Sequence, residues 1–387
     1  MTHADVIVIG GGVIGASVAH HLATRGVRRI TILDRGPAPG EGSTGRATGG
    51  FRAQYGTAIN IRLSLLARRK LLDFKDEIGA DPGYDPAGYL WLSADAREQQ
   101  ILEEGVAVQH AEGLPEAGAV TRDNVRRLNP ALAGDGIFGG VYCPTDGFIR
   151  PLSILDGYLK SAVRTAAKPV WNATVRQIER DGSGRISAVV TSGDRLPCGA
   201  VVNAAGAWAA EVAAMAGVSL PVEPLRRQVA ATAPCDLLPP RMPMTIFAGD
   251  GYHLRVRDGR VLLLWPTPGH PGAPFDTRVD DDWVAEVQVK TAQRVPTLRD
   301  VPIDRAASWA GLYEMSPDKH AILGPAPECP NFYLVNGSSG HGVMHSPALG
   351  QLLAEIICDG RASTLDVSAL SPGRFAEGRL NQVSELL

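Results

Sequence analysis

Apolar runs and glycine-rich turns alternate at the start of the chain. Residues 5–9 (DVIVI) form a short β-branched run, typical of a strand buried on both faces of a parallel sheet. Apolar residues then recur at helical spacing from Val13 until Gly26, which predicts a helix that ends at this glycine. Residues 29–33 predict a second strand. The order strand, helix, strand is typical of an α/β domain with a parallel sheet.

The turn between the first strand and the helix carries a dinucleotide-binding pattern. It reads GGGVIG and satisfies G-x-G-x-x-G in the required place. Gly10 permits the tight turn, Gly12 lets a pyrophosphate approach the backbone, and Gly15 lets helix and strand pack closely. Asp34 follows the second strand, about 20 residues beyond the last glycine, where an acid meets the ribose hydroxyls of an adenosine. We therefore expect a bound dinucleotide, with its phosphates at the helix N-terminus.

Two later segments repeat the order strand, glycine turn, helix. They are residues 200–208 (AVVNAAGAW) and residues 332–344 (FYLVNGSSGHGVM), and Ser346 and Pro347 predict the N-terminus of the helix after the second. The small-residue loop at 40–50 offers amides and hydroxyls for a second phosphate and the rim of a ring. A nicotinamide enzyme would continue with strand-helix units instead, so this organisation favours FAD over NAD.

Composition excludes several classes of protein. A net charge of −3 provides no long-range attraction to nucleic acid or to an anionic membrane surface. The five cysteines are far apart and form no CxxC or Cys/His cluster, so we expect no disulfide framework and no metal site. The apolar stretch 200–222 is interrupted by polar residues and a proline, and no export leader precedes the first strand. We expect a soluble protein of the cytoplasm, without nucleic-acid or membrane partners.

These motifs, with Ser43-Thr44 and residues 309–313 (WAGLY), together resemble the D-amino-acid oxidase superfamily of FAD-dependent oxidoreductases. The branch that they resemble contains sarcosine oxidase, glycine oxidase and the dye-linked proline dehydrogenase β-subunit. The resemblance runs nearly end to end. It implies an α/β (α+β) fold, in which a Rossmann-like FAD-binding domain is interleaved with a substrate domain built on a mainly antiparallel sheet. The implied ranges are 1–80, 146–220 and 305–387 for the FAD-binding domain, and 81–145 and 221–304 for the substrate domain.

The resemblance also implies the reaction, which is oxidation of the C–N bond of a small amino acid or of a secondary or N-methyl amine, followed by hydrolysis of the imine. It assigns FAD contacts to the glycine turns, the acid after the second strand, the small-residue loop and the N-terminus of the last helix. In this sequence they are Gly10, Gly12, Val13, Ile14, Gly15, Asp34, Arg35, Ser43, Thr44, Arg46, Ala47, Thr48, Val175, Ala205, Gly206, Trp208, Gly311, Gly340, His341, Gly342, Val343 and Met344.

Four residues are candidates for catalysis. Arg52 matches the arginine that pairs with the substrate carboxylate in sarcosine oxidases, and a planar guanidinium suits bidentate binding. Tyr252 matches an active-site tyrosine of the same relatives. His253 points to the opposite face of a regular strand, which makes it the weaker candidate. His341 lies in the glycine turn, where we favour a cofactor contact over catalysis.

Several positions depart from the relatives. Gly311 replaces a cysteine, and Pro151 replaces a histidine, that link the flavin covalently in sarcosine oxidases, so the FAD is expected to be noncovalent. Alignment places Leu263 where those oxidases have a lysine that helps oxygen accept electrons. Met344 replaces a second carboxylate anchor, and Tyr313 replaces an arginine of glycine oxidase. The acceptor is accordingly oxygen or an electron-accepting partner, with a second subunit as one option.

Two other functions stay open at this point. A 2-hydroxy-acid oxidoreductase would need a base, and His253 or His341 would have to serve. A noncatalytic flavin-binding assembly protein would hold FAD without turnover. The pattern at 226–228 (RRQ) indicates either the domain interface near the flavin or a solvated charged pair.

Overall fold

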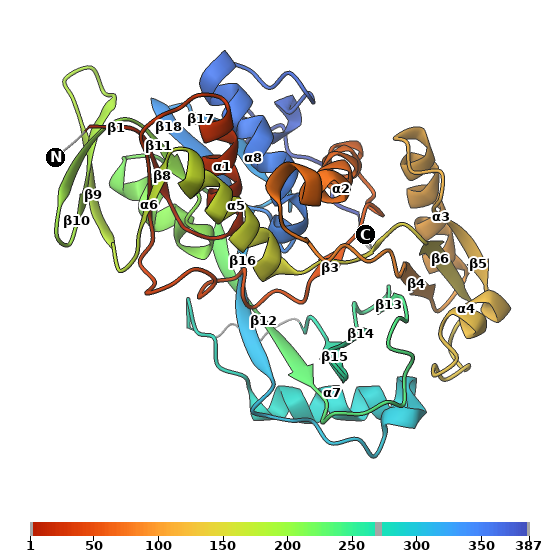
Figure 1. Ribbon diagram of the computed structural model, residues 1–387. Helices are drawn as coiled ribbons and strands as arrows, with labels where there is room; N and C mark the ends of the chain where they lie inside the picture. The colour runs from red at the N-terminus through yellow and green to blue at the C-terminus, as the bar shows by residue number, and fades with distance from the viewer. Residues whose placement is uncertain (1–2, 268–272, 385–387) are drawn as a thin grey trace.

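Two large sheets lie in different halves of the molecule (Figure 1). The computed structural model describes residues 3–267 and 273–384. The first sheet has the strand order β17-β18-β11-β1-β2-β8, and β10 and β9 extend it from β11. Its strands are β1 (Ala4–Ile9), β2 (Ile30–Leu33), β8 (Ala167–Val170), β9 (Val175–Arg180), β10 (Ile186–Thr191), β11 (Arg195–Asn203), β17 (Ile322–Ala326) and β18 (Cys329–Asn336). Strand β1 pairs in parallel with β2 and β11, as the predicted α/β fold requires.

The second sheet has the order β16-β12-β15-β14-β13-β4-β6-β5 and is antiparallel except for the β13–β4 pair. Its strands are β4 (Tyr89–Ser93), β5 (Gly118–Thr121), β6 (Gly139–Cys143), β12 (Glu223–Ala231), β13 (Met244–Phe247), β14 (His253–Arg257), β15 (Arg260–Leu264) and β16 (Trp309–Met315). A two-stranded ribbon, β3 (Gly50–Phe51) with β7 (Gly147–Phe148), completes the strands of the described ranges. This arrangement confirms the predicted fold class.

The helices cover the faces of both sheets. They are α1 (Val13–Thr24), α2 (Ala58–Ile78), α3 (Ala96–Ala111), α4 (Arg122–Leu128), α5 (Pro151–Thr165), α6 (Ala209–Met215), α7 (Asp281–Arg294) and α8 (Gly342–Asp359), with the 3-10 turns η1 (Gly206–Trp208), η2 (Pro296–Leu298), η3 (Ser368–Leu370) and η4 (Pro372–Arg374). Helices α1, α2, α5 and α8 share one core with β1, β2, β17 and β18, whereas α6 packs on the opposite face. Helix α7 covers the outer face of the second sheet.

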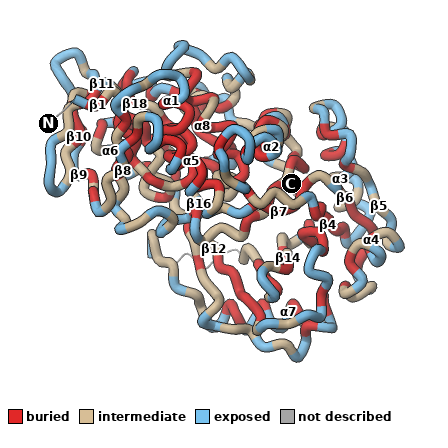
Figure 2. The backbone as a smooth tube through the Cα atoms, viewed as in Figure 1, coloured by how far each residue is buried: buried red, intermediate tan, exposed pale blue. Residues whose placement is uncertain are grey.

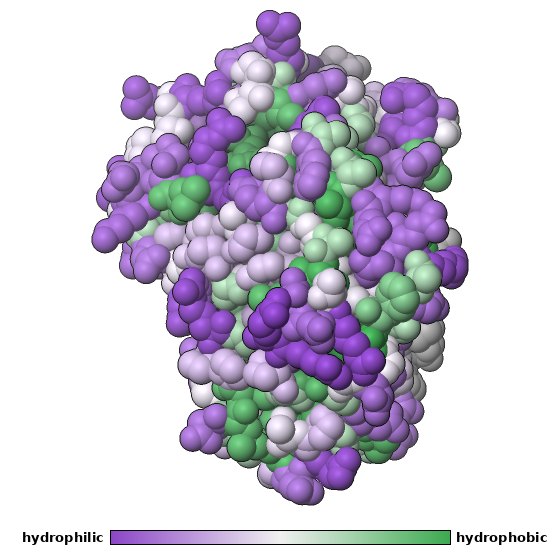
Figure 3. Space-filling model, turned by 90° about the vertical axis from the view of Figure 1, so that its right-hand side faces the viewer, coloured by the Kyte–Doolittle hydropathy of each residue, from purple (hydrophilic) through white to green (hydrophobic). Residues whose placement is uncertain are grey.

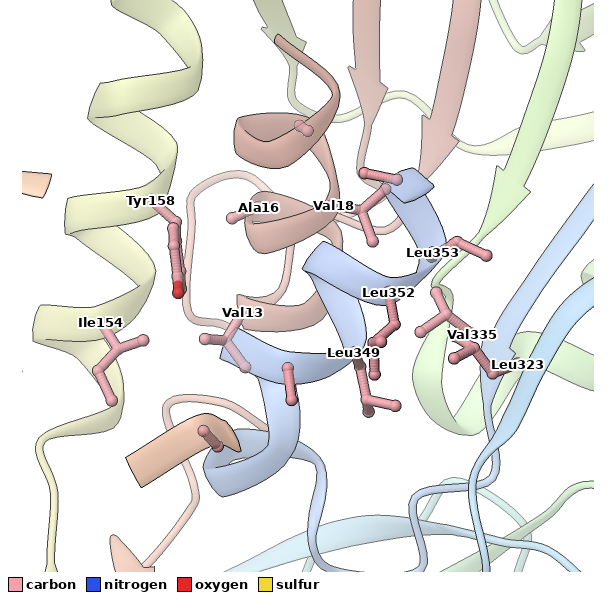
Figure 4. Packing of buried hydrophobic residues seen from close by; sticks show 14 of the residues in the cluster. Val13, Ala16, Val18, Ile154, Tyr158, Leu323, Val335, Leu349, Leu352 and Leu353 are labelled. Atoms are coloured by element: carbon pink, nitrogen blue, oxygen red, sulfur yellow. The ribbon is translucent and has the colours of Figure 1, made fainter. Parts of the chain in front are cut away.

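The largest core lies where α1, α5 and α8 meet. Side chains of α1, among them Ala16 and Val18, pack between α5 and α8, and Leu352 of α8 reaches toward β17 and β18 (Figure 4). Buried positions are concentrated in this layer and under the second sheet (Figure 2). Burying each large aliphatic side chain contributes about 1.5–3 kcal/mol, so these contacts hold the N-terminal strand-turn-helix unit firmly in place.

The start of α8 differs from the prediction. The sequence places the cap at Ser346, but the helix begins at Gly342 and contains Pro347 in its interior. A proline cannot donate to the carbonyl four residues earlier, which here belongs to Val343. The Ser346 hydroxyl donates to that carbonyl instead, at 2.8 Å. This substitute hydrogen bond explains why the helix extends one turn further toward the N-terminus.

A buried ion pair ties the C-terminal segment to the first sheet. The Arg374 guanidinium donates to both carboxylate oxygens of Asp318 at 2.9 Å, and Asn381 also donates to this carboxylate. Both charged side chains are at most 1% exposed. These donors hold the pKa of Asp318 below its ordinary value, although burial opposes them.

In the part of the chain that the structure describes, no helix is both long and apolar enough to cross a bilayer. The face shown in Figure 3 mixes hydrophilic side chains with scattered hydrophobic ones.

Candidate active site

The glycine turn after β1 has the geometry that its spacing predicts. Gly10 has a φ of +112°, and a Cβ there would overlap the Ala204 carbonyl of the next strand. A Cβ on Gly15 would overlap the Gly10 carbonyl, so α1 can approach the turn only at a glycine. A Cβ on Gly12 would approach only the Thr44 hydroxyl, at 3.3 Å. Protein backbone therefore fills the space beside Gly10 and Gly15, whereas the space beside Gly12 is open.

The predicted acid lies beside this turn. The Asp34 carboxylate accepts from the Gly11 amide and from the Gly36 amide, each at 2.7 Å. A Cβ on Gly11 would meet the ring of Trp171, a residue that the sequence did not single out. Because Trp171 follows β8 rather than the glycine turn, no local pattern connects the two.

Arg35 and Trp208 contact each other. The Arg35 guanidinium lies 4.3 Å from the centroid of the Trp208 ring, which stacks on Phe275 at 5.2 Å. The second glycine turn, Ala205-Gly206, thereby comes next to the Asp34 segment. Val175 is buried on the α6 side of the first sheet.

The predicted small-residue loop connects the two sheets. The Thr44 hydroxyl accepts from the Val13 amide of α1 at 3.1 Å, and Ser43 donates to the Leu312 carbonyl of β16 at 2.7 Å. Arg46 donates to the Ala310 carbonyl at 2.8 Å. Residues 43–46 of the loop are therefore bonded both to α1 and to β16.

Arginines of β14 bind the same loop from the second sheet. Arg255 donates to the Thr48 carbonyl at 2.8 Å, and Arg257 donates to the Ala47 carbonyl at 3.3 Å. Arg46 also packs over Gly311, where a Cβ would lie 3.1 Å from the Arg46 Cβ. Gly311 consequently has little room for a larger side chain.

The N-terminus of α8 completes the predicted cofactor set. A Cβ on Gly342 would lie 3.2 Å from Ile14, so the two predicted phosphate-side helices adjoin here. Gly340 lies against the Tyr313 ring. The Met344 sulfur accepts from the Tyr55 hydroxyl at 3.2 Å, which places this side chain in the protein interior.

Unpartnered polar atoms occur beside this helix start. Both side-chain polar atoms of Asn336, the Ser338 hydroxyl and one oxygen of Glu314 are buried and without hydrogen-bond partners among the described residues. A buried unsatisfied polar group costs about 1–3 kcal/mol. A flavin ring carries both carbonyl and N–H groups, so it offers partners for such atoms. Together with the open turn at Gly12, these residues fit FAD.

The register of the second sheet determines which side chains face the cofactor half. His253 pairs with Leu264, and Arg227 pairs with Gly311, whose neighbours on the same face are Trp309 and Tyr313. Val229 and Leu264 pack in one cluster with Trp309, which confirms that these positions share a face. Arg227, His253 and Tyr313 therefore lie on one side of the sheet.

Arg52 occupies the centre of the candidate site. It donates to the Gln54 carbonyl at 2.6 Å and approaches the Nε2 atom of His341 at 3.4 Å. Its guanidinium lies 4.0 Å from the Tyr55 ring centroid and 5.0 Å from that of Trp91. No carboxylate pairs with Arg52 in the described ranges, which leaves the guanidinium available for an anionic ligand.

Burial and nearby positive charges determine the protonation of His341 and His253. Burial and the charge of Arg52 hold the pKa of His341 well below its ordinary value. Burial, with the charges of Arg52 and Arg227, lowers the pKa of His253 to about 4. Both imidazoles are therefore neutral near pH 7, and His341 can accept a hydrogen bond from Arg52.

Tyr252 lies away from this group. Its hydroxyl bonds the Thr291 hydroxyl of α7 at 2.8 Å, and the residue is 0% exposed in the core between α7 and the sheet. The expected alternation of Tyr252 and His253 is present, and it places His253 on the face of Arg227 and Tyr252 on the face that α7 covers. The packing of α7 therefore favours His253 over Tyr252 as a site residue.

Leu263, the position aligned with the oxidase lysine, is also on the outer face. It is 1% exposed and belongs to the core under α7, whereas its neighbour Leu264 shares the face of His253. Both residues are leucines, so β15 supplies no cation at either of these two positions. Cations on this face come from the two adjacent strands: Arg227 of β12, which the sequence left open, and Arg255 and Arg257 of β14, which alternate with His253.

Asp146 supports the segment that carries Arg52. Its buried carboxylate accepts from the Ala53 amide at 2.8 Å and from the Gln54 amide at 3.2 Å. Burial raises the pKa of Asp146 to about 7 despite these bonds. The sequence did not indicate this residue, because its partners lie far away along the chain.

Comparison with known proteins agrees with this geometry. A family model named DAO, described as FAD dependent oxidoreductase, matches residues 5–356. The fold and the site define an FAD-dependent oxidoreductase, and the chain belongs to the DAO family. The predicted family resemblance and the predicted FAD cofactor are thereby confirmed.

Individual relatives cover nearly the whole chain. The glycine oxidase of Geobacillus kaustophilus is 30% identical, over 92% of this chain and 94% of the relative. FAD-dependent oxidoreductase domain-containing protein 1 of Xenopus laevis is 28% identical, over 96% of this chain and 82% of the relative. The crystal structure of L-proline dehydrogenase from P. horikoshii has a TM-score of 0.90 at 28% identity and covers 98% of this chain and 99% of that chain.

Proposed function

We propose that the protein oxidises the C–N bond of a small amino acid or of a secondary or N-methyl amine that carries a carboxylate. Arg52 is the observation that supports this most strongly. Its guanidinium contacts the rings of Tyr55 and Trp91, is unpaired with any acid of the described residues, and lies beside the N-terminus of α8. A bidentate carboxylate contact would fix the substrate in one orientation.

The same surroundings favour the reactive form of an amine. An amine gives up a hydride only as the free base, whereas most alkylamines are protonated in water. Burial lowers the pKa of His253, and the charges of Arg52 and Arg227 add to this effect; both charges would act in the same direction on a bound ammonium group. His341 accepts a hydrogen bond from Arg52 and so helps to hold its guanidinium in place.

FAD supplies the hydride acceptor when it is bound. The residues that would hold it are the turn at Gly10 to Gly15, the Ser43–Thr48 loop and the start of α8. Gly311 and Pro151 have no side chain that can bond to a flavin, so attachment is noncovalent. The released imine is then hydrolysed in water to a carbonyl compound and an amine.

The proposal includes the interleaved domains. Residues 1–80, 146–220 and 305–387 form the FAD-binding part and residues 81–145 and 221–304 the substrate part, with the ends and residues 268–272 outside the described residues. Strand β16 is an exception, since it lies within the first set but pairs with β12 of the second sheet. This strand, with β12, connects the two parts (Figure 1).

Anaerobic absorbance titration of the FAD-bound protein tests the function. N-methyl amino acids, proline, glycine and D-amino acids are added separately, and 2-hydroxy acids form the comparison panel. We expect bleaching of the flavin by an amine class, and admission of air then distinguishes oxygen from an electron-accepting partner. Bleaching by hydroxy acids alone would contradict the proposal, as would silence across the panel.

Substitution of Arg52 tests the anchor itself. Arg52→Lys keeps a positive charge but loses the planar fork, and we expect kcat/KM to fall about 10-fold to 100-fold, because a charge-assisted hydrogen bond contributes about 1.5–3 kcal/mol. Arg62→Lys is the matched control, since Arg62 lies on the exposed side of α2 and pairs with Glu112. Equal activities of the two variants would remove Arg52 from the proposal.

A further inference from the structure

A second unpaired guanidinium reaches the face of the sheet that carries His253. Arg226 and Arg227 are adjacent in β12, so their side chains leave opposite faces of the strand. Arg226 bonds Asp280 at 2.6 Å and lies 3.4 Å from Asp276. Arg227 has no ion pair or side-chain hydrogen bond within the described ranges, and its contact is with the Tyr313 ring, 5.9 Å from the centroid.

The neighbouring strand β16 does not supply an acid to Arg227. Glu314 of β16 pairs with Pro224, which by alternation places Glu314 on the face of Arg226 rather than on that of Arg227. Arg227 is half-buried, and this burial lowers its pKa. A guanidinium kept in such a position without a partner is destabilising unless a ligand supplies one.

Arg227 and Arg52 lie near the same turn, at the start of α8. Tyr313, the ring that Arg227 contacts, packs against Gly340, and Arg52 approaches the next residue, His341, at 3.4 Å. Arg52 also has no carboxylate partner in the described part of the chain. Arg255 and Arg257 also lie on the His253 face, but both donate to backbone carbonyls of the small-residue loop. Arg52 and Arg227 are therefore the candidate anion-binding groups, and a substrate with a single carboxylate would leave one of them without an acid partner.

We propose that the substrate is a dicarboxylic amine, in which Arg52 binds one carboxylate and Arg227 binds a second carboxylate on the other arm of the amine. The proposal rests on the amine-oxidising function proposed above and specifies its substrate class. A second carboxylate would give Arg227 the acid partner that the described residues do not supply.

The test compares paired substrates on the FAD-bound protein. N-Methylglycine is compared with glycines whose nitrogen carries a carboxymethyl, carboxyethyl or carboxypropyl arm, by anaerobic flavin reduction. We expect at least one dicarboxylic amine to exceed N-methylglycine in kcat/KM by about tenfold or more. Arg227→Gln should abolish this preference, because it lowers kcat/KM for the dicarboxylic amine by more than it lowers kcat/KM for N-methylglycine, whereas Arg227→Lys should restore part of the preference.

Two further readouts keep the proposal falsifiable. The first readout is the binding of glutarate and butyrate, which cannot be oxidised as amines, measured by the change that they cause in the flavin absorbance. It tests for the second anion site even if no amine is oxidised. Tighter binding of glutarate that Arg227→Gln removes would support the second anion site. Equal binding of the two acids, or a preference that Arg227→Gln leaves unchanged, would overturn it.

The flavin reduction potential tests the other role of this arginine. If Arg227→Gln shifts the potential of the ligand-free protein and weakens mono- and dicarboxylates equally, the guanidinium serves the cofactor and the proposal is wrong. Thermal melting and FAD content of each variant confirm that it is folded. Failure of all amines to bleach the flavin would instead contradict the proposed function, independently of the glutarate result.

Discussion

Gly12→Ala separates folding of the glycine turn from binding of the cofactor. Gly12 has a φ of −73° and a ψ of −179°, which alanine adopts readily. The added Cβ would meet only the Thr44 hydroxyl, at 3.3 Å, so the FAD-free protein has room for it. We expect its free energy of unfolding to change by about 1 kcal/mol or less.

FAD binding should respond very differently to the same methyl group. The methyl occupies the side from which a pyrophosphate approaches the turn amides, and each lost charge-assisted hydrogen bond costs about 1.5–3 kcal/mol. The dissociation constant for FAD should therefore rise about 10-fold to 100-fold for one such bond. Titration of the FAD-free protein by flavin fluorescence measures this change, and urea unfolding measures the stability.

Gly42→Ala is the matched control, because nothing lies within 4 Å of a Cβ at that position and its φ is not positive. It should alter neither quantity. An unchanged dissociation constant in a well-folded Gly12→Ala protein would refute the assignment of this turn to the phosphates.

Other consequences follow from buried polar groups. Tyr252→Phe should lower the free energy of unfolding by about 1 kcal/mol and leave kcat/KM nearly unchanged. His253→Ala should reduce kcat/KM by at least about tenfold. The opposite pattern in steady-state kinetics would return Tyr252 to the site. Arg374→Met should cost about 3–5 kcal/mol in urea unfolding, because it leaves a buried carboxylate unpaired, while Arg379→Met at an exposed pair should cost less than about 1 kcal/mol. Because the folded pKa of Asp146 is raised from 3.8 to about 7, its ionisation should reduce stability as the pH rises from about 4 to 7, with no further loss above. The unfolding free energy of Asp146→Asn relative to the parent should therefore improve over this window, and a difference that is constant with pH would contradict the assignment.

Local patterns predicted the cofactor half well. The strand, the turn and the helix from residue 4 to residue 24 are contiguous, and the roles of Gly10 and Gly15 depend on contacts within a few residues or with the adjacent strand. Asp34 lies beside the turn because its spacing from the turn is set by one helix and one strand. Such features are encoded over short stretches of chain.

The substrate side depended on packing between distant segments. Alternation in β14 predicted that Tyr252 and His253 point to opposite faces, but α7, which begins at Asp281, determines which face is outer. The same holds for Arg227, since acids near residue 280 neutralise its neighbour and not Arg227 itself. The early start of α8 was not predicted, because Pro347 was expected to lie in the first helical turn. The Ser346 hydroxyl replaces the hydrogen bond that the proline cannot make.

A single-turnover product analysis tests the central claim most directly. The FAD-bound protein is mixed anaerobically with the amine that bleaches it best, and the carbonyl compound and the released amine are quantified against the flavin reduced. For an acyclic amine we predict one equivalent of each, since hydride removal from the carbon next to nitrogen followed by hydrolysis yields both; for a cyclic amine such as proline we predict one equivalent of a ring-opened compound that carries both groups. Reduced flavin without a carbonyl product, or a flavin that no amine reduces, would contradict the account.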